Sequence, residues 1–94
     1  MMSTPAPNPH YRVDPHARFR VLDGEGIFVL QKAGEVLVVN AVGAFIVERL
    51  ERDMPLDEII REVSRRYDVD DARAGADARA LIDSLLEAGA IQES

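Results

Sequence analysis

The pattern of hydrophobic and polar residues divides the chain into an N-terminal part with strand periodicity and a C-terminal part with helical periodicity. Before Asn40 there are four consecutive branched apolar residues, and three of them are β-branched, which favours a buried strand over residues 35–39. After Asn40, apolar residues recur at helical spacing. The side chain of Asn40 can accept hydrogen bonds from backbone N–H groups two or three residues on, so we predict that it caps a helix. The strand residues are Val36, Leu37, Val38 and Val39, and the helical positions are Val42, Phe45, Ile46 and Leu50.

Two further strands are predicted before this junction. Residues 18–22 alternate polar and apolar side chains, and residues 27–31 form a second apolar segment. Turn sequences over residues 23–26 and 32–34 separate the three strands, and the first contains the Asp-Gly pair that is typical of hairpins. Because these connections are too short for a parallel crossover, the pattern predicts a three-stranded antiparallel meander.

Three helices are predicted after the junction, so the fold class is α+β. Their apolar stripes cover residues 41–52, a second segment from near Pro55 to Tyr67, and a third from Asp70 or Asp71 to about Ala88. One of the two aspartates is expected to cap the third helix. Gly89 is expected to end it in a left-handed conformation, after which residues 90 and 91 fold back on the core.

Length and composition indicate one small domain. Residues 13–94 are expected to form it, and the proline-rich residues 1–12 are expected to be a disordered or loosely docked tail. No apolar run approaches the ~20 residues of a membrane span, and no secretory signal pattern is present. With no cysteine in the chain, disulfides and thiolate chemistry are excluded, and a cytoplasmic location is the default expectation.

Candidate catalytic, metal and cofactor residues are scarce. His10 and His16 have no carboxylate or cysteine at a recognisable ligand spacing, so we predict ordinary surface histidines and no metal. The Gly24-x-Gly26 sequence lacks the third glycine and the following helix of a dinucleotide site, so no cofactor is expected. No nucleophile and base pair is visible, and an enzyme acting alone is not expected.

The charge of the chain bears on its partners. The formal net charge is −6 and Lys32 is the single lysine, whereas nucleic-acid binding depends on neutralising phosphates with cations. The arginines are interspersed with acidic residues and do not cluster along the sequence. We therefore expect no nucleic-acid partner.

Two features exceed what a minimal core requires. The strand over residues 35–39 is apolar on both faces, although a three-stranded sheet with helices on one side should have one polar face. Either a ligand, the N-terminal segment or a second copy of the chain covers the extra face. The third helix carries an apolar stripe that is wider than one packing interface requires. One explanation is that a small domain buries most of this helix. The other is that one row of the stripe lines a groove, in which Ala74 and Ala78 leave room for a ligand.

At this point the sequence resembles the PqqD-like family, also called the precursor peptide recognition element. The resemblance extends over roughly residues 18–91. The matching pieces are Val39-Asn40, residues 43–46, Leu56-x-Glu58-Ile59, residues 67–70 and residues 89–91. Three positions depart from the family pattern: Ala78 and Ala90 replace larger aliphatic residues, and Pro55 stands where a capping Ser or Thr is common.

The resemblance implies a winged helix-turn-helix-like fold with three strands followed by three helices, and a non-catalytic role. Such domains bind the leader region of a ribosomally made precursor peptide and present it to a modifying enzyme, such as a radical SAM protein or a leader peptidase. The leader is added as a strand between the third strand and the third helix. The expected peptide-binding residues are Val36, Leu37, Val38, Val39, Ala74, Ala78, Leu81, Ile82 and Leu85.

Two other functions are compatible with this fold. A structural module could form a homodimer by pairing its edge strand with a second copy. A DNA-binding winged helix would place the third helix in the major groove, but that helix carries more acidic than basic residues. The peptide-binding adaptor accounts best for the doubly apolar strand, because strand addition uses both an edge and side-chain pockets.

Overall fold

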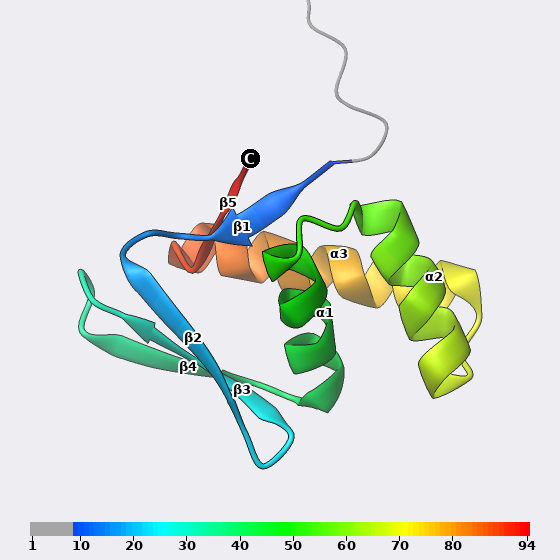
Figure 1. Ribbon diagram of the computed structural model, residues 1–94, viewed down its shortest axis with the longest axis horizontal. Helices are drawn as coiled ribbons and strands as arrows, with labels where there is room; N and C mark the ends of the chain where they lie inside the picture. The colour runs from blue at the N-terminus through cyan, green and yellow to red at the C-terminus, as the bar shows by residue number, and fades with distance from the viewer. Residues whose placement is uncertain (1–8) are drawn as a thin grey trace, which may run out of the picture.

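The computed structural model describes residues 9–94 and has the expected α+β architecture (Figure 1). A three-stranded antiparallel sheet has the order β2-β3-β4, and a separate two-stranded ribbon joins β1 to β5. The elements are β1 (Tyr11–Val13), β2 (Ala17–Leu22), β3 (Glu25–Leu30), β4 (Glu35–Val39), α1 (Ala41–Glu51), α2 (Leu56–Tyr67), α3 (Asp71–Ala88) and β5 (Ile91–Glu93). The predicted meander and three helices are thus confirmed.

The strand register assigns each sheet residue to one of two faces. Phe28 lies opposite Phe19 on β2 and Leu37 on β4, and these three side chains form the inner face with their strand neighbours at every second position. Phe28 is fully buried, and its ring centroid lies 4.8 Å from that of Phe19. The helices cover this inner face, which appears in Figure 1 as the side of the sheet toward α1.

The turn between β2 and β3 is tighter than the four residues that the sequence suggested. Only Asp23 and Gly24 lie in it, both with positive φ (51° and 81°), as a two-residue hairpin turn of the primed type requires. Gly26 belongs to β3 instead. A Cβ atom there would lie 2.7 Å from the ring of Phe19 and 2.7 Å from a methyl group of Val39, so the glycine is needed for close packing.

The predicted helix caps are confirmed. The Asn40 side chain accepts a hydrogen bond of 2.9 Å from the Gly43 N–H, and β4 therefore turns directly into α1. Asp70, and not Asp71, caps α3 by accepting from the Arg73 N–H at 2.8 Å. Gly89 ends α3 with φ of 78°.

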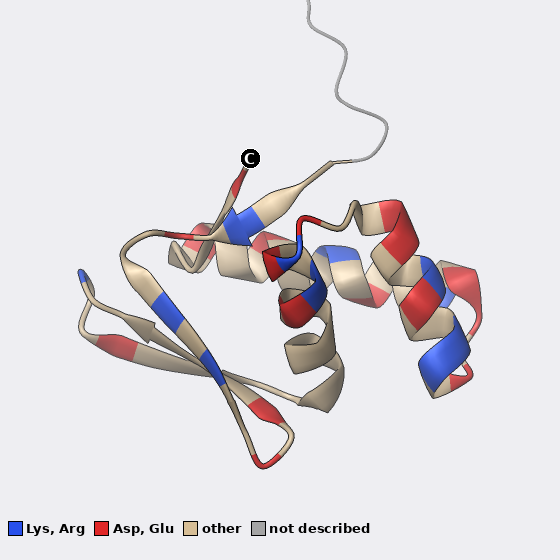
Figure 2. Ribbon diagram, in the orientation of Figure 1, with Lys and Arg blue, Asp and Glu red and all other residues tan. Residues whose placement is uncertain are grey.

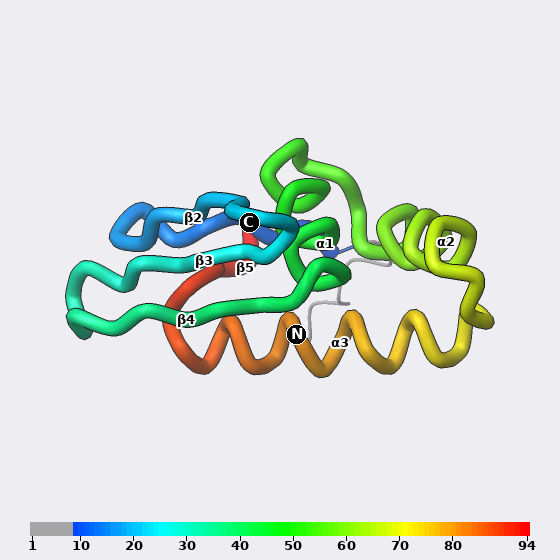
Figure 3. Tube along the Cα trace, turned by 90° about the horizontal axis from the view of Figure 1, so that it is seen from below, coloured from blue at the N-terminus to red at the C-terminus, as the bar shows by residue number. Residues whose placement is uncertain are grey.

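Helix α1 is the centre of the domain. It contacts β1, β3, β4, α2 and α3, and six of its residues are buried. Figure 3 shows it between the sheet and α2, with α3 running the length of the molecule beneath them. The largest fully buried side chains come from α1, α2, α3 and β3: Phe28, Ile46, Val47, Leu50, Ile59 and Ile82.

The β1–β5 ribbon is the element that the sequence did not predict. Tyr11 and Arg12 belong to it although they fall in the predicted tail, and they pair with Glu93 and Gln92. Ala90, just before β5, and Ile91, the first residue of β5, are buried as expected. These two residues attach the ribbon to the core. The predicted tail over residues 1–8 lies outside the described residues.

Candidate functional site

The free edge of β4 is the first part of the candidate site. Among the described residues β4 pairs only with β3, so every second backbone N–H and C=O of β4 points to an unpaired edge. On the outer face next to this edge, Val36 and Val38 are each 60% exposed. With Leu22 and Val29 they form an apolar surface on the side of the sheet that no helix of residues 9–94 covers (Figure 1).

The four predicted strand residues are therefore divided between the two faces. Val36 and Val38 are exposed on the outer face, whereas Leu37 is half-buried and Val39 buried on the inner face. The expectation of an apolar strand on both faces is correct, and its second face is open within residues 9–94.

Helix α3 is arranged differently from the expected groove wall. Four of its five predicted site residues are buried in the core: Ala74, Ala78, Ile82 and Leu85. Ala78 has no exposed surface at all. The two alanines therefore do not line an open groove in this conformation. Their stripe packs inside the domain because so small a chain needs most of this helix for its core.

The fifth predicted residue, Leu81, marks the flank of α3 that borders the core. It is half-buried, and Asp77, Ser84 and Ala88 lie on the same flank because they are four residues before, three after and seven after it. These three residues were not predicted, although the helical period from Leu81 identifies them. The flank combines one apolar anchor with two small side chains and one carboxylate.

The opposite flank of α3 faces β1. Burial raises the pKa of the half-buried Tyr11 above its usual value, and the negative charges of Glu93 and Asp83 raise it further, while Arg79 opposes them. Asp83 and Arg79 thus lie on the β1 side of α3. The Leu81 flank is turned away from that ribbon.

A hollow of about 250 Å³ lies where the Leu81 flank reaches the β3–β4 turn. Residues from the end of α3 and from the turn before β4 both line this hollow. Its lining residues are Asp14, His16, Leu30, Lys32, Ala33, Ala88 and Gly89. In Figure 3, α3 follows β4 in the order β2, β3, β4, α3, and in Figure 1 it lies on the inner-face side of the sheet. The free edge of β4 thus runs along the side of the molecule where α3 lies.

The other edge of the sheet is protected. Arg18 and Arg20 lie on β2, where Figure 2 shows two basic positions along the strand. Charged side chains on an edge strand disfavour pairing with another strand. In β4 the one charged residue is Glu35 at its start, so this edge lacks the charged side chains along the strand that protect β2.

Each of the two histidines lies beside one carboxylate. The Nδ1 atom of His10 lies 3.0 Å from a carboxylate oxygen of Asp53, and His16 lies beside Asp14. Within residues 9–94, no three His, Cys, Asp or Glu residues are grouped so as to hold a metal ion. None of the helices in this part of the chain is long and apolar enough to span a membrane.

The fold and the open β4 edge define a small winged-helix-like α+β domain. Residues 18–91 match the family described as coenzyme PQQ synthesis protein D (PqqD). The chain belongs to the PqqD family. A comparison with curated proteins found no significant match.

Two solved structures share the fold. Lasso peptide synthetase B1 complexed with the leader peptide has a TM-score of 0.82 and 25% sequence identity, and the match covers 88% of this chain and 98% of that one. TbiB1 in complex with the TbiA(beta) leader peptide has a TM-score of 0.81 and 21% identity, with coverage of 86% and 94%.

Proposed function

We propose that this chain is a non-catalytic adaptor that binds the leader region of a ribosomally synthesised precursor peptide and presents it to a modifying enzyme. The similar lasso peptide synthetase B1 was solved with a leader peptide bound, and its fold matches nearly the whole of this chain. Membership of the PqqD family supports the same role. The modifying enzyme is a separate protein, such as a radical SAM enzyme or a leader peptidase.

One observation carries this proposal: the sheet has one protected edge and one open edge. The leader is added as a fourth strand to β4, so that main-chain hydrogen bonds supply affinity. Side chains of an added strand alternate between the two faces. Those on the outer face lie beside the exposed Val36 and Val38, and such cross-strand apolar pairs each contribute roughly 0.2–1 kcal/mol.

Side chains of the leader that point to the inner face determine its selectivity. They approach Leu37 and the Leu81 flank of α3, where Leu81 is the apolar anchor. Ser84 and Ala88 leave space for larger groups, and the hollow at the β3–β4 turn accepts one side chain at the end of the added strand. The buried Ala74, Ala78, Ile82 and Leu85 support this flank from within and do not contact the leader directly.

Amide NMR with the leader encoded beside this gene tests the proposal. Shifts are expected at residues 35–39 and along the Leu81 flank. Ser84→Arg places a long cation on this flank at an exposed position and is expected to weaken binding without altering the melting temperature. Ala76→Arg is the matched control, because Ala76 is also exposed on α3 but lies away from that flank.

Two outcomes would contradict the proposal. Leader binding with shifts confined to α2 or the β2–β3 turn would show that the added strand lies elsewhere. A tight homodimer through β4, with no binding of the leader even at millimolar concentration, would show that the open edge serves dimerisation.

A further inference from the structure

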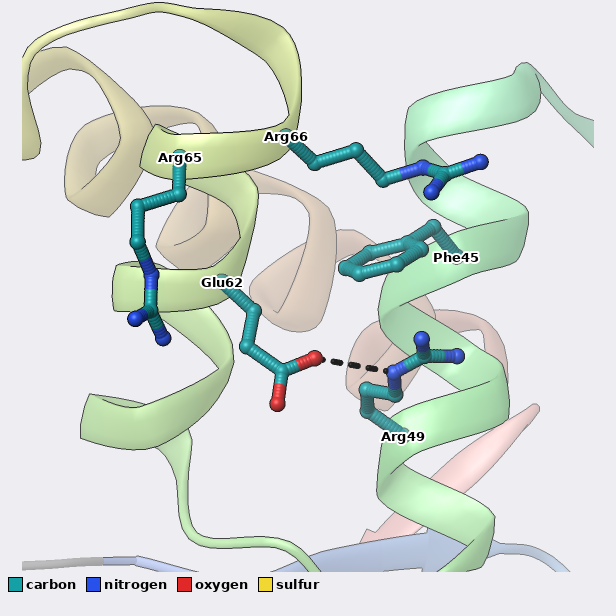
Figure 4. A pocket seen from close by; sticks show the side chains of 5 residues that line it. All are labelled: Phe45, Arg49, Glu62, Arg65 and Arg66. Atoms are coloured by element: carbon teal, nitrogen blue, oxygen red, sulfur yellow. Dashed lines mark hydrogen bonds and ion pairs between the residues drawn. The ribbon is translucent and has the colours of Figure 1, made fainter.

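A second hollow, of about 460 Å³, opens between α1 and α2 (Figure 4). It is lined by Phe45 and Arg49 of α1 and by Glu62, Arg65 and Arg66 of α2. In Figures 1 and 4, α3 lies behind these two helices, so the hollow opens on the side of the helices away from α3. It is therefore separate from the β4 edge and the Leu81 flank.

Two of the three guanidinium groups in this hollow, those of Arg49 and Arg66, lie against one aromatic ring. Phe45 is buried, and the guanidinium carbon of Arg49 lies 4.0 Å from its ring centroid. Arg66 approaches the same ring at 5.4 Å, from the other side of the ring in Figure 4, and approaches Tyr67 at 5.8 Å. Such cation–π contacts hold planar guanidinium groups in place and leave their N–H edges free to donate.

The charges of the hollow are not balanced. Glu62 accepts a hydrogen bond of 3.1 Å from Nε of Arg49, and this is the one carboxylate in the lining. Three cations and one anion leave a charge of +2 here, in a chain whose net charge is −6. Among residues 9–94, no carboxylate lies within ion-pair distance of Arg65 or Arg66.

We infer that this hollow is a docking site for an acidic segment of a partner protein, which binds through Asp or Glu carboxylates. A guanidinium group can present two parallel N–H groups to a carboxylate. The Arg49–Glu62 pair, joined by one hydrogen bond from Nε, already shows that a carboxylate is accepted in this hollow. A polyanion such as nucleic acid would be repelled by the acidic remainder of the chain, whereas a short acidic segment meets only the basic hollow. The partner can bind here while the β4 edge is occupied.

A short capped oligoglutamate peptide is the probe, and an oligoglutamine peptide of equal length is its neutral control. In NMR titrations of the full chain, oligoglutamate is expected to shift the amides of α1 and α2 around the hollow and the side-chain Nε–H signals of Arg49 and Arg66. Arg66→Gln is expected to weaken binding about tenfold, as the loss of a charged hydrogen bond implies. Arg20→Gln on β2 removes the same charge from a distant surface and should leave the affinity unchanged.

Glu62→Gln is the most specific variant because it is expected to increase the affinity for oligoglutamate. Removing the one negative charge of the hollow should tighten oligoglutamate binding about threefold, and it frees Arg49 to donate to the peptide. Unchanged or weaker binding would overturn the inference, as would shifts centred on the sheet. Tighter binding of inorganic phosphate than of oligoglutamate at the same residues would identify a site for free oxyanions and would also overturn it. Leader binding measured on Arg66→Gln is expected to be unaltered, so this test is independent of the proposed function.

Discussion

Tyr11 lies directly opposite Glu93 in the β1–β5 ladder, so the two ends of the described chain are paired. The ribbon continues on both sides, since the N–H of Ser94 donates to the carbonyl of His10 at 3.0 Å and the N–H of Asp14 donates to that of Ala90 at 2.9 Å. Local unfolding of either end therefore removes the pairing of the other.

The position of Tyr11 in this ribbon predicts that the stability of the fold depends on pH in the alkaline range. Because burial and neighbouring carboxylates raise the pKa of Tyr11 in the fold, the folded state keeps the phenol proton more tightly than the unfolded state does. Its contribution to stability is complete below the unfolded pKa of about 10 and is lost as the pH rises through the folded pKa. Between about pH 9 and about pH 11, the melting temperature of the Tyr11→Phe variant should therefore fall less than that of the parent chain. An equal loss in both proteins would show that Tyr11 does not couple to folding.

The cap of α1 predicts a loss of stability without a specific loss of function. Asn40→Ala removes the acceptor for the Gly43 N–H and should destabilise the domain by ~1 kcal/mol. Asn40→Asp keeps an acceptor at the same position and is the control. Denaturant unfolding measures both variants, and peptide affinity corrected for the folded fraction should be the same as in the parent chain. An unchanged midpoint for Asn40→Ala would contradict the assigned junction between β4 and α1.

The burial of Ala78 predicts that a charge there unfolds the domain. Ala78 has no exposed surface, so Ala78→Arg forces an unpaired cation into the core at a cost of several kcal/mol, which is comparable to the total stability of a small domain. Ala80→Arg, two residues away on the exposed side of α3, should retain a cooperative unfolding transition. Circular dichroism melting curves distinguish the two. A folded Ala78→Arg variant that fails to bind peptide would place Ala78 in an accessible groove instead.

The charge of α3 predicts an absence of specific DNA binding. Together with its N-cap, α3 has five acidic residues and only two basic ones. The acidic residues are Asp70, Asp71, Asp77, Asp83 and Glu87, and the basic ones are Arg73 and Arg79. Arg73 also lies 3.8 Å from the Asp77 carboxylate. In a fluorescence anisotropy titration at physiological salt, no sequence-selective binding should approach the ~10⁻⁸ M of specific binders. Submicromolar, sequence-selective binding would favour a regulator over an adaptor.

Local sequence was sufficient to predict the three strands of the main sheet, the three helices and the caps of α1 and α3. The Asp-Gly hairpin, the Asn40 cap and the Gly89 terminator each depend on the conformational preference of one or two residues and on hydrogen bonds to near neighbours. Such interactions depend little on the rest of the fold, so a pattern of neighbouring residues identifies them. The doubly apolar β4 was visible for the same reason, because side chains in a strand alternate whatever the strand packs against.

The tertiary structure alone determined which residues share a surface. The apolar stripe of α3 was wide enough for two arrangements, and the packing of the whole domain decided that Ala74, Ala78, Ile82 and Leu85 lie inside while Leu81 is half-buried at the border of the core. The β1–β5 ribbon joins segments at opposite ends of the chain, each only three residues long, whose pairing no local pattern records. The basic hollow likewise depends on the packing of α1 against α2. Arg49 is separated in the sequence from the adjacent Arg65 and Arg66, and the ring of Phe45 brings Arg49 and Arg66 together.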